Sequence, residues 1–361
     1  MSTNNRTGRK RDYVGVLSSV FAIVIGLLVG FVILLICNPS QALPGFVTIL
    51  TGAFTHGLKG VGQVFYYATP IILTGLSVGF AFKTGLFNIG TPGQFIVGAF
   101  AAVYVGIMWT GLGRIQWAVA LLAAILGGAL WGMVPGFLKA CFNVNEVIAS
   151  IMMNYIGMYM VNWIVKSYKP LFNNLRNESR NVAATAQIPK MGMDKLFPES
   201  SVGGGILLAI AAVLIIWVIL NKTTFGYELK AVGFNRDASR YAGINEKRNI
   251  IMSMVIAGAI AGMAGGLLYL AGTGKHIEIK DGFTGISVAL LGLSHPIGVL
   301  FSGLFIAYLT AGGFYLQLFE FSTEIIDIIV AVIIYFSAFA LIVKTILTRM
   351  NRKREKGDGR T

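Results

Sequence analysis

The chain alternates long apolar runs with short polar links, the pattern of a protein that crosses a membrane many times. An α-helix needs about 20 apolar residues to cross the hydrocarbon core. The runs of suitable length and composition are residues 16–36, 61–82, 93–112, 116–138, 145–165, 204–221, 249–272, 284–294, 296–314 and 324–347. The sequence therefore predicts an all-α, polytopic membrane protein with about ten transmembrane helices.

Glycine and proline interrupt the apolar pattern once in each half of the chain. The first interruption reads GLFNIGTPGQFIVG over residues 85–98, and the second reads LLGLSHPIGVLFSG over residues 290–303. Paired interruptions of this kind mark discontinuous helices near the transport site of several repeat-built transporters. Because proline disrupts a helix interior, residues 284–314 form either one helix kinked at Pro296 or two short helices.

The distribution of basic residues predicts the orientation in the membrane. Both ends of the chain are rich in lysine and arginine, and the positive-inside rule places such segments in the cytoplasm. Two cytoplasmic ends require an even number of crossings, which favours ten. We therefore expect a basic N-terminus (1–13), a transmembrane domain (14–347) with an external loop (166–203) and a cytoplasmic segment (222–248), and a basic tail (348–361).

Composition agrees with this class of protein. Apolar residues make up 55% of the chain and charged residues 12%, whereas soluble domains have about 25% charged residues. The formal net charge of +14 lies mostly in the ends and loops, without interleaved aromatic residues, which points to contact with membrane lipid and not with nucleic acid. Many of the 45 glycines recur four residues apart, as in Gly128, Gly132 and Gly136, a spacing that lets helix backbones approach closely.

The chain lacks the residues for several kinds of chemistry. It has no GxxxxGK[ST] phosphate-binding loop, so we expect that it binds no ATP itself. Cys37 and Cys141 are predicted on opposite sides of the membrane, which disfavours a disulfide, and His56, His276 and His295 lack the spacing of metal ligands. No predicted span holds clustered catalytic side chains or a series of acids and bases. We therefore predict a transport protein that is not an enzyme.

The polar segment 222–248 carries the signals of a short helix. Asn235 can cap a helix that begins near Arg236, and Asp237 lies in the first turn, where the helix dipole favours an acid. Gly243 can end this helix in a left-handed conformation. The segment is therefore predicted to form a short amphipathic helix outside the membrane.

Uncharged polar residues repeat along the fifth predicted span. Asn154 and Asn162 are eight residues apart and Tyr155 and Tyr159 are four apart, so they form adjoining strips of one helix. Amides can bind hydroxyls or base edges and tyrosine rings can stack on a nucleobase, although hydrogen bonding between helices explains the same residues. With the polar residues of the first interruption, the candidate substrate-pathway residues are Asn88, Thr91, Gln94, Asn154, Tyr155, Tyr159 and Asn162.

Acidic residues near helix starts have a structural explanation. Asn143 is predicted to cap the fifth span, with Glu146 three residues on in an arrangement resembling a capping box. Glu324 and Asp327 lie in the first turn of the last span, where the dipole stabilises them. The alternative for these acids is a position in an outer vestibule.

Four stretches resemble one family of transport proteins. They are residues 75–100 (GLSVGFAFKTGLFNIGTPGQFIVGAF), 144–156 (VNEVIASIMMNYI) and 282–305 (GFTGISVALLGLSHPIGVLFSGLF), together with the glycine, asparagine and alanine pattern of 226–247. From about residue 15 to 345 the chain is similar to the permease subunits of bacterial nucleoside ABC importers. These form a branch of the ribose and branched-chain amino acid permeases.

The resemblance implies partners in a bacterial cell membrane. They are a separate ATPase subunit that uses the ATP, a second permease that is often a different homologous chain, and an external substrate-binding lipoprotein or binding protein. The external residues 275–281 would receive the binding protein. The residues expected to couple to the ATPase are Gly226, Gly233, Asn235, Arg236, Ala238, Ala242 and Gly243.

We therefore expect the permease subunit of an ABC importer that carries nucleosides, most of all purine nucleosides, into the cell. Two alternatives remain open. One is the same mechanism with ribose or another monosaccharide as cargo. The other belongs to a different class, an ion-coupled carrier or channel, which would keep working when ATP is depleted and the ion gradients are clamped.

Overall fold

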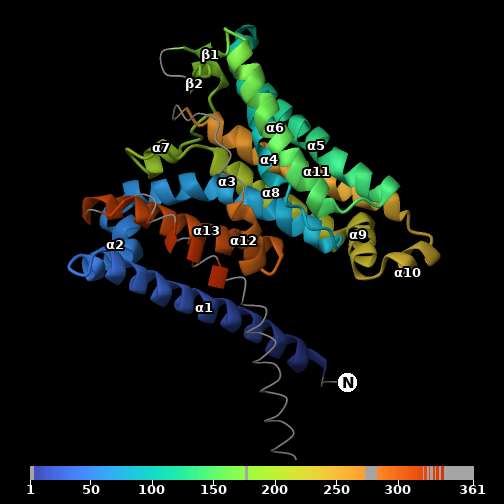
Figure 1. Cartoon of the computed structure of the whole chain (residues 1–361), viewed down its shortest axis with the longest axis horizontal. Helices are drawn as coiled ribbons and strands as arrows, with labels where there is room; N and C mark the ends of the chain where they lie inside the picture. The colour runs from blue at the N-terminus through green and yellow to red at the C-terminus, as the bar shows by residue number, and fades with distance from the viewer. Residues whose placement is uncertain are drawn as a thin grey trace, which may run out of the picture. The chain divides into compact units, whose positions relative to one another are not determined.

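The computed structural model describes residues 4–174, 178–272, 283–319, 321–322 and the positions 325, 328–329, 331–332 and 335–336. In these residues the secondary structure is almost entirely helical (Figure 1). The chain forms two compact units, one of residues 1–52 and 309–361 and the other of residues 53–308. The predicted fold class, an all-α polytopic membrane protein, is confirmed.

The larger unit is built around four apolar helices that contact one another. These are α3 (Gly57–Lys83), α4 (Thr91–Met108), α5 (Gln116–Phe142) and α11 (Glu246–Tyr269), and α11 touches the other three. Helix α6 (Glu146–Ser167) packs against α4 and α5, and α8 (Gly205–Lys222) packs against α3. Helix α11 is therefore the centre of this unit.

Glycine lets α4, α5 and α11 touch backbone to backbone. A Cβ atom added to Gly128 of α5 would clash with the carbonyl oxygen of Gly258 of α11, and one added to Gly98 of α4 would clash with the Cα of Gly262. A Cβ on Gly132 would meet the carbonyl oxygen of Met254. The predicted packing role of the glycines four residues apart is thus confirmed for these helices.

Both interruptions are breaks between helices. The first leaves residues 84–90 non-helical between α3 and α4, and the second separates α12 (Thr284–Leu291) from α13 (Pro296–Phe314). At the second break, Leu293 and Ser294 have φ angles of 54° and 52°, in the left-handed region that side chains other than glycine seldom adopt. Residues 284–314 therefore form two helices, and the alternative of one helix kinked at Pro296 is wrong.

Seven described helices are long and apolar enough to cross a membrane. They are Gly57–Lys83, Thr91–Met108, Thr110–Phe142, Glu146–Ser167, Gly205–Lys222, Glu246–Tyr269 and Pro296–Phe319. Each overlaps a crossing predicted from the sequence. The 3₁₀ turns η1 (Thr110–Ile115) and η3 (Tyr315–Phe319) extend two of these helices at their ends.

The predicted crossing at 284–294 is wrong. Helix α12 has eight residues, so at about 1.5 Å per residue it covers roughly 12 Å and cannot span the hydrocarbon core alone. The apolar helix α2 (Ala42–Thr55) was not predicted, because glycine, threonine and proline dilute its pattern. Most of the predicted crossing at 324–347, with Glu324 and Asp327, and all of the tail 348–361 lie outside the described residues.

The smaller unit contains α1 (Asn4–Cys37), most of α2 and the end of α13. The predicted crossing at 16–36 lies within α1. The rings of Phe31 and Phe46 pack with their centroids 5.0 Å apart, which joins α1 to α2. A Cβ atom on Gly45 would press on the ring of Phe321, so this unit too depends on a glycine at a helix contact.

The long loop after α6 is held against the ends of α4 and α11. It contains a small hairpin, β1 (Phe172–Asn173) with β2 (Glu178–Ser179), the turn η2 (Ala184–Ala186) and the short helix α7 (Met193–Leu196). The amide of Ala183 donates to the carbonyl of Gly106 in α4, and that of Ile188 donates to the carbonyl of Leu270 after α11. The loop therefore packs at one end of the helical bundle.

Candidate functional site

The segment between α8 and α11 folds into two short helices joined by one residue. Helix α9 (Thr224–Phe234) begins after Thr223, whose hydroxyl accepts the amide of Gly226, and α10 (Arg236–Tyr241) begins after Asn235. The Asn235 side chain accepts the amide of Ala238 at 2.9 Å. The predicted cap is confirmed, whereas α9 was not predicted.

Gly243 ends the second helix as predicted. Its φ angle is +80°, and its amide donates to the carbonyl of Arg240 while the amide of Ile244 donates to that of Ser239. This satisfies carbonyls that the end of a helix otherwise leaves without partners. The turn directs the chain from α10 into α11, whose first turn is capped by Asn245.

These two helices carry exposed aromatic side chains beside a groove that Phe234 helps to line. We call the surface formed by α9 and α10 the α9–α10 surface. Phe234 is 91% exposed and Tyr241 is 94% exposed, and the adjoining groove has a volume of about 550 Å³. Asn235, Ala238 and Ala242, three of the predicted coupling residues, line the groove. Exposed apolar side chains around a groove are typical of a surface that binds another protein.

Two other predicted coupling residues, Gly226 and Gly233, face the membrane helices. A Cβ on Gly226 would clash with the carbonyl of Ile219 in α8, and one on Gly233 would clash with the carbonyl of Lys83 at the end of α3. These glycines explain why the sequence did not indicate α9. They suggest a loop, but in the folded chain they allow helix α9 to lie directly against α8 and α3.

Arg236 ties α10 to the membrane helices. Its Nε donates to the carboxylate of Glu246, the first residue of α11, at 2.5 Å, and its Nη1 lies 3.5 Å from the side-chain oxygen of Asn143 at the end of α5. On α9, Glu228 accepts the amide of Asn249 in α11 at 3.0 Å. These hydrogen bonds connect the α9–α10 surface directly to α11 and to the link between α5 and α6.

The capping role predicted for Asn143 is wrong. Asn143 has a φ angle of 53° and ends α5, and the N-cap of α6 is Asn145, which accepts the amide of Val147 at 2.9 Å. Glu146 instead makes an ion pair of 2.8 Å with Lys139 of α5. Asparagine tolerates the left-handed conformation, so it can end one helix as easily as start the next.

A second candidate site is a buried network of amides at the start of α4. Asn88 donates to the side-chain oxygen of Gln94 at 2.9 Å and accepts from the Gln94 amide at 3.1 Å, while the Thr91 hydroxyl donates to the Asn88 carbonyl. From α6, Asn154 accepts the amide of Gly93 at 2.8 Å. These four predicted pathway residues lie together, and we call them the buried amide network.

The sequence did not single out Ser150, which belongs to the same place. It is fully buried on α6, one turn before Asn154, and its hydroxyl has no hydrogen-bond partner among the described residues. A Cβ atom on Gly90, the residue before α4, would lie 3.2 Å from the Cβ of Ser150. A serine in an apolar helix offers no signal of this kind until the helices are placed side by side.

The remaining predicted pathway residues are separated from this network. Tyr155 and Tyr159 are 56% and 66% exposed, and Asn162 is also exposed. They lie along the outward side of α6, which we call the α6 strip. The structure therefore divides the predicted set into two groups. One is the buried amide network between α4 and the inner side of α6, and the other is the exposed strip on the outward side of α6.

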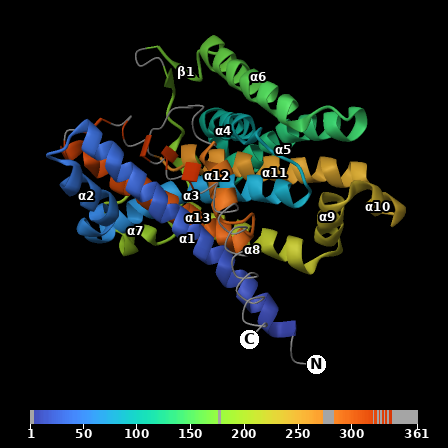
Figure 2. The ribbon, with the colours of Figure 1, turned by 60° about the horizontal axis from the view of Figure 1, so that its bottom comes forward.

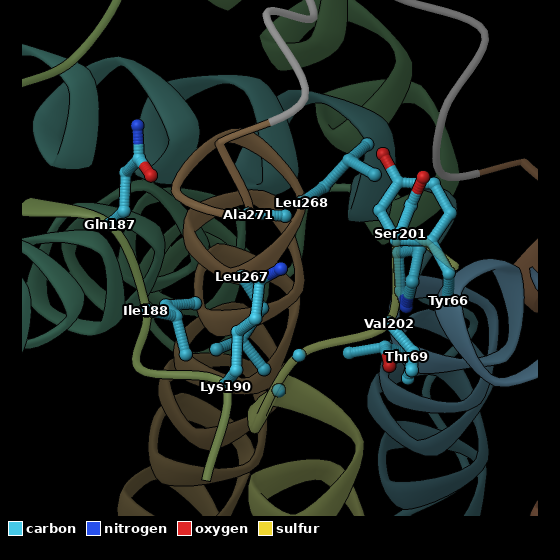
Figure 3. A pocket seen from close by; sticks show the side chains of 13 residues that line it. Tyr66, Thr69, Gln187, Ile188, Lys190, Ser201, Val202, Leu267, Leu268 and Ala271 are labelled. Atoms are coloured by element: carbon cyan, nitrogen blue, oxygen red, sulfur yellow. The ribbon is translucent and has the colours of Figure 1, made fainter. Parts of the chain in front are cut away.

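Figure 3 shows a small cavity beside the long loop that follows α6. Tyr66 and Thr69 of α3 line one side, and Ile188 of the loop and Leu267 of α11 line the other. Its volume is about 80 Å³, whereas pockets for small-molecule ligands generally have about 300–1,000 Å³. This cavity has room for a few water molecules and is not a substrate site in this conformation.

The family of the chain follows from comparison with known proteins. Residues 60–338 match the family described as the permease component of the branched-chain amino acid transport system. The chain belongs to this permease family. It is a membrane-spanning transport subunit, as the sequence motifs indicated. No solved structure matches the permease significantly.

Curated relatives resemble the permease over most of its length. The guanosine ABC transporter permease NupP of Bacillus subtilis is 38% identical, over 92% of this chain and 96% of its own. The nucleoside ABC transporter permease NupB of Lactococcus lactis is 34% identical, over 96% of this chain and 95% of its own. The glucose ABC transporter permease TsgB13 of Haloferax volcanii is 31% identical, over 81% of this chain and 78% of its own.

Proposed function

We propose that this permease passes nucleosides, most of all purine nucleosides, across the cell membrane, using ATP that a separate subunit hydrolyses. The α9–α10 surface is the observation that carries the proposal. It combines exposed aromatics, a groove of about 550 Å³ and direct bonds to α11 and to the link between α5 and α6. An ATPase docked there could move these helices.

The relatives support the choice of cargo. The two relatives named for guanosine or nucleosides match 92% and 96% of this chain. A monosaccharide is the second candidate, because a relative named for glucose is 31% identical. We expect the buried amide network to take part in the pathway, since it holds the start of α4 at the first interruption.

The proposed assembly has three further parts. Docking of an ATPase on the α9–α10 surface implies that this surface is cytoplasmic, and that the loop 166–203, one crossing away, is external and receives a substrate-binding protein or lipoprotein. Both basic ends of the chain are expected to be cytoplasmic by the positive-inside rule. A second permease is expected because each of the two bacteria with a nucleoside relative has another permease of the same description that resembles this chain. This chain itself would bind no ATP.

Uptake measurements test the proposal. Labelled guanosine, adenosine, uridine, ribose and glucose are supplied separately at one low concentration to cells with and without the gene. We expect loss of nucleoside uptake alone, and loss of that uptake in normal cells when ATP is depleted with ion gradients clamped. Loss of sugar uptake alone would favour the second candidate, and uptake that persists without ATP would contradict the mechanism.

A further inference from the structure

Helix α6 presents an outward surface that differs from the other exposed surfaces of the bundle. It packs mainly against α4 and α5 and lies at the edge of the larger unit (Figure 2). Its outward side carries the α6 strip, flanked by the exposed side chains of Met152 and Ile156. Among the described residues, the side chains of Tyr155, Tyr159 and Asn162 form no hydrogen bond within the chain.

The position of the tyrosines makes contact with lipid unfavourable. Tyr155 and Tyr159 lie on either side of the midpoint of α6, which runs from Glu146 to Ser167. Tyrosines of membrane proteins concentrate at the membrane surface, where the hydroxyl reaches water or headgroups. At mid-helix in hydrocarbon, both hydroxyls would be left without a partner, as would much of the hydrogen-bonding capacity of Asn162.

Helix α8 provides the comparison within the same chain. It is also apolar and largely exposed, but between residues 207 and 218 its large exposed side chains are all aliphatic, and its exposed polar residues Asn221 and Lys222 lie at its end. The aliphatic side chains are Leu207, Ile210, Leu214, Ile215 and Val218. Such a surface suits lipid tails directly, whereas the α6 strip needs groups that can donate and accept hydrogen bonds. Interhelical hydrogen bonds between polar side chains are a usual means of joining membrane helices.

We infer that the α6 strip is the surface on which the second permease of the transporter packs. The inference rests on the proposed function, because that assembly supplies a second chain with membrane-spanning helices. A water-soluble ATPase or binding protein cannot reach the midpoint of α6, whereas another membrane helix can. Contact there also places the partner one helix away from the buried amide network, since Asn154 on the inner side of α6 holds Gly93.

Photocrosslinking in intact membranes tests this inference. The photoreactive residue p-benzoylphenylalanine is introduced in place of Tyr159, or in place of Leu214 on α8 as the matched control, in cells that express the whole transporter. After irradiation, crosslinked peptides are identified by mass spectrometry. We expect at least a tenfold higher yield of adducts with a permease of this family from position 159 than from position 214.

The nature of the adduct decides the outcome. A second permease attached at position 159 supports the inference. Its sequence also shows whether the transporter contains two copies of this chain or two different permeases. Adducts with lipid alone, adducts with the ATPase or binding protein alone, or equal yields of permease adducts from both positions would overturn it. The crosslink reports contact and not uptake, so a wrong cargo assignment would leave the permease adduct unchanged. Failure of the proposed function and failure of the inferred interface are therefore distinguishable.

Discussion

Asn154 of α6 accepts the amide of Gly93 at 2.8 Å, across 61 residues of sequence, and so fixes the start of α4. Its own amide group donates to the carbonyl of Ile89 at 3.0 Å. One side chain therefore satisfies a backbone donor and a backbone acceptor that the interruption between α3 and α4 leaves free. The interruption is therefore held by a neighbouring helix as well as by its own residues.

Replacing Asn154 by leucine should destabilise the protein and lower transport. The amide of Gly93 and the carbonyl of Ile89 would stay buried without partners, at about 1–3 kcal/mol for each group. Thermal unfolding in detergent and initial uptake rates measure the two effects. Asn162→Leu on the exposed side of α6 is the control for stability, and equal unfolding temperatures for the two variants would contradict the role of Asn154.

Replacing both Phe234 and Tyr241 by serine should weaken binding of the ATPase while leaving the fold intact. Both side chains are more than 90% exposed, so their loss removes little packing within the chain. Truncated interface aromatics often cost about 2 kcal/mol or more each, which is more than tenfold in affinity. Co-purification of the two subunits at increasing dilution measures this. Leu196→Ser, at an exposed site on α7, should have no effect, and a similar loss there would show that the assay does not report docking.

Substitutions of Gly243 separate backbone conformation from other effects. The φ angle of +80° is accessible to asparagine but strained for valine, which is β-branched. We expect Gly243→Val to uncouple ATP hydrolysis from uptake, because the end of α10 and its connection to α11 would shift. Gly243→Asn should keep most of the activity. Normal coupling in the valine variant would show that the shape of this turn is unimportant.

The pair of Arg236 and Glu246 should act as one connection between α10 and α11. Arg236→Ala, Glu246→Ala and the double variant are compared for the ratio of transported substrate to hydrolysed ATP. We expect each single change to lower the ratio and the double change to add little more, since residues that act together are not additive. Effects that simply add would contradict a direct connection. Because the pair is only partly buried, its effect on stability should stay within about 1 kcal/mol.

The glycine contacts of α11 predict a difference between two matched substitutions. Gly258→Ala would place a methyl group against the backbone of α5, whereas Gly203→Ala in the loop before α8 meets no atom within 4 Å. Overpacking of this kind typically destabilises a protein by about 1–3 kcal/mol. Thermal unfolding of the purified variants checks the prediction. Equal stability of both would mean that α5 and α11 can separate without loss.

Most helices and turns could be predicted from the sequence, because each of these elements depends on a few adjacent residues. The apolar runs, the cap at Asn235 and the left-handed end at Gly243 are all short-range features. The break before Pro296 was also visible. Helix α9 was missed because the reason for Gly226 and Gly233 lies in α8 and α3, which are distant in the sequence.

The candidate site was predictable only in part. Composition and spacing selected Asn154, Tyr155 and Tyr159 on one helix, but not which side of that helix would be buried. The bond between Gly93 and Asn154 and the inclusion of Ser150 depend on how α4 and α6 lie side by side. Likewise, the number of charges in 222–248 did not reveal that Arg236 bonds inward to Glu246 while the aromatics face outward.

The backbone contacts among α4, α5 and α11 have a mechanical consequence. Where side chains interdigitate, helices can slide by exchanging rotamers, but glycine surfaces in direct contact offer no rotamers to exchange. These three helices should therefore move as a single stiff block. Arg236 and Glu228 join the α9–α10 surface to α11. A displacement of that surface should therefore move α4, α5 and α11 together.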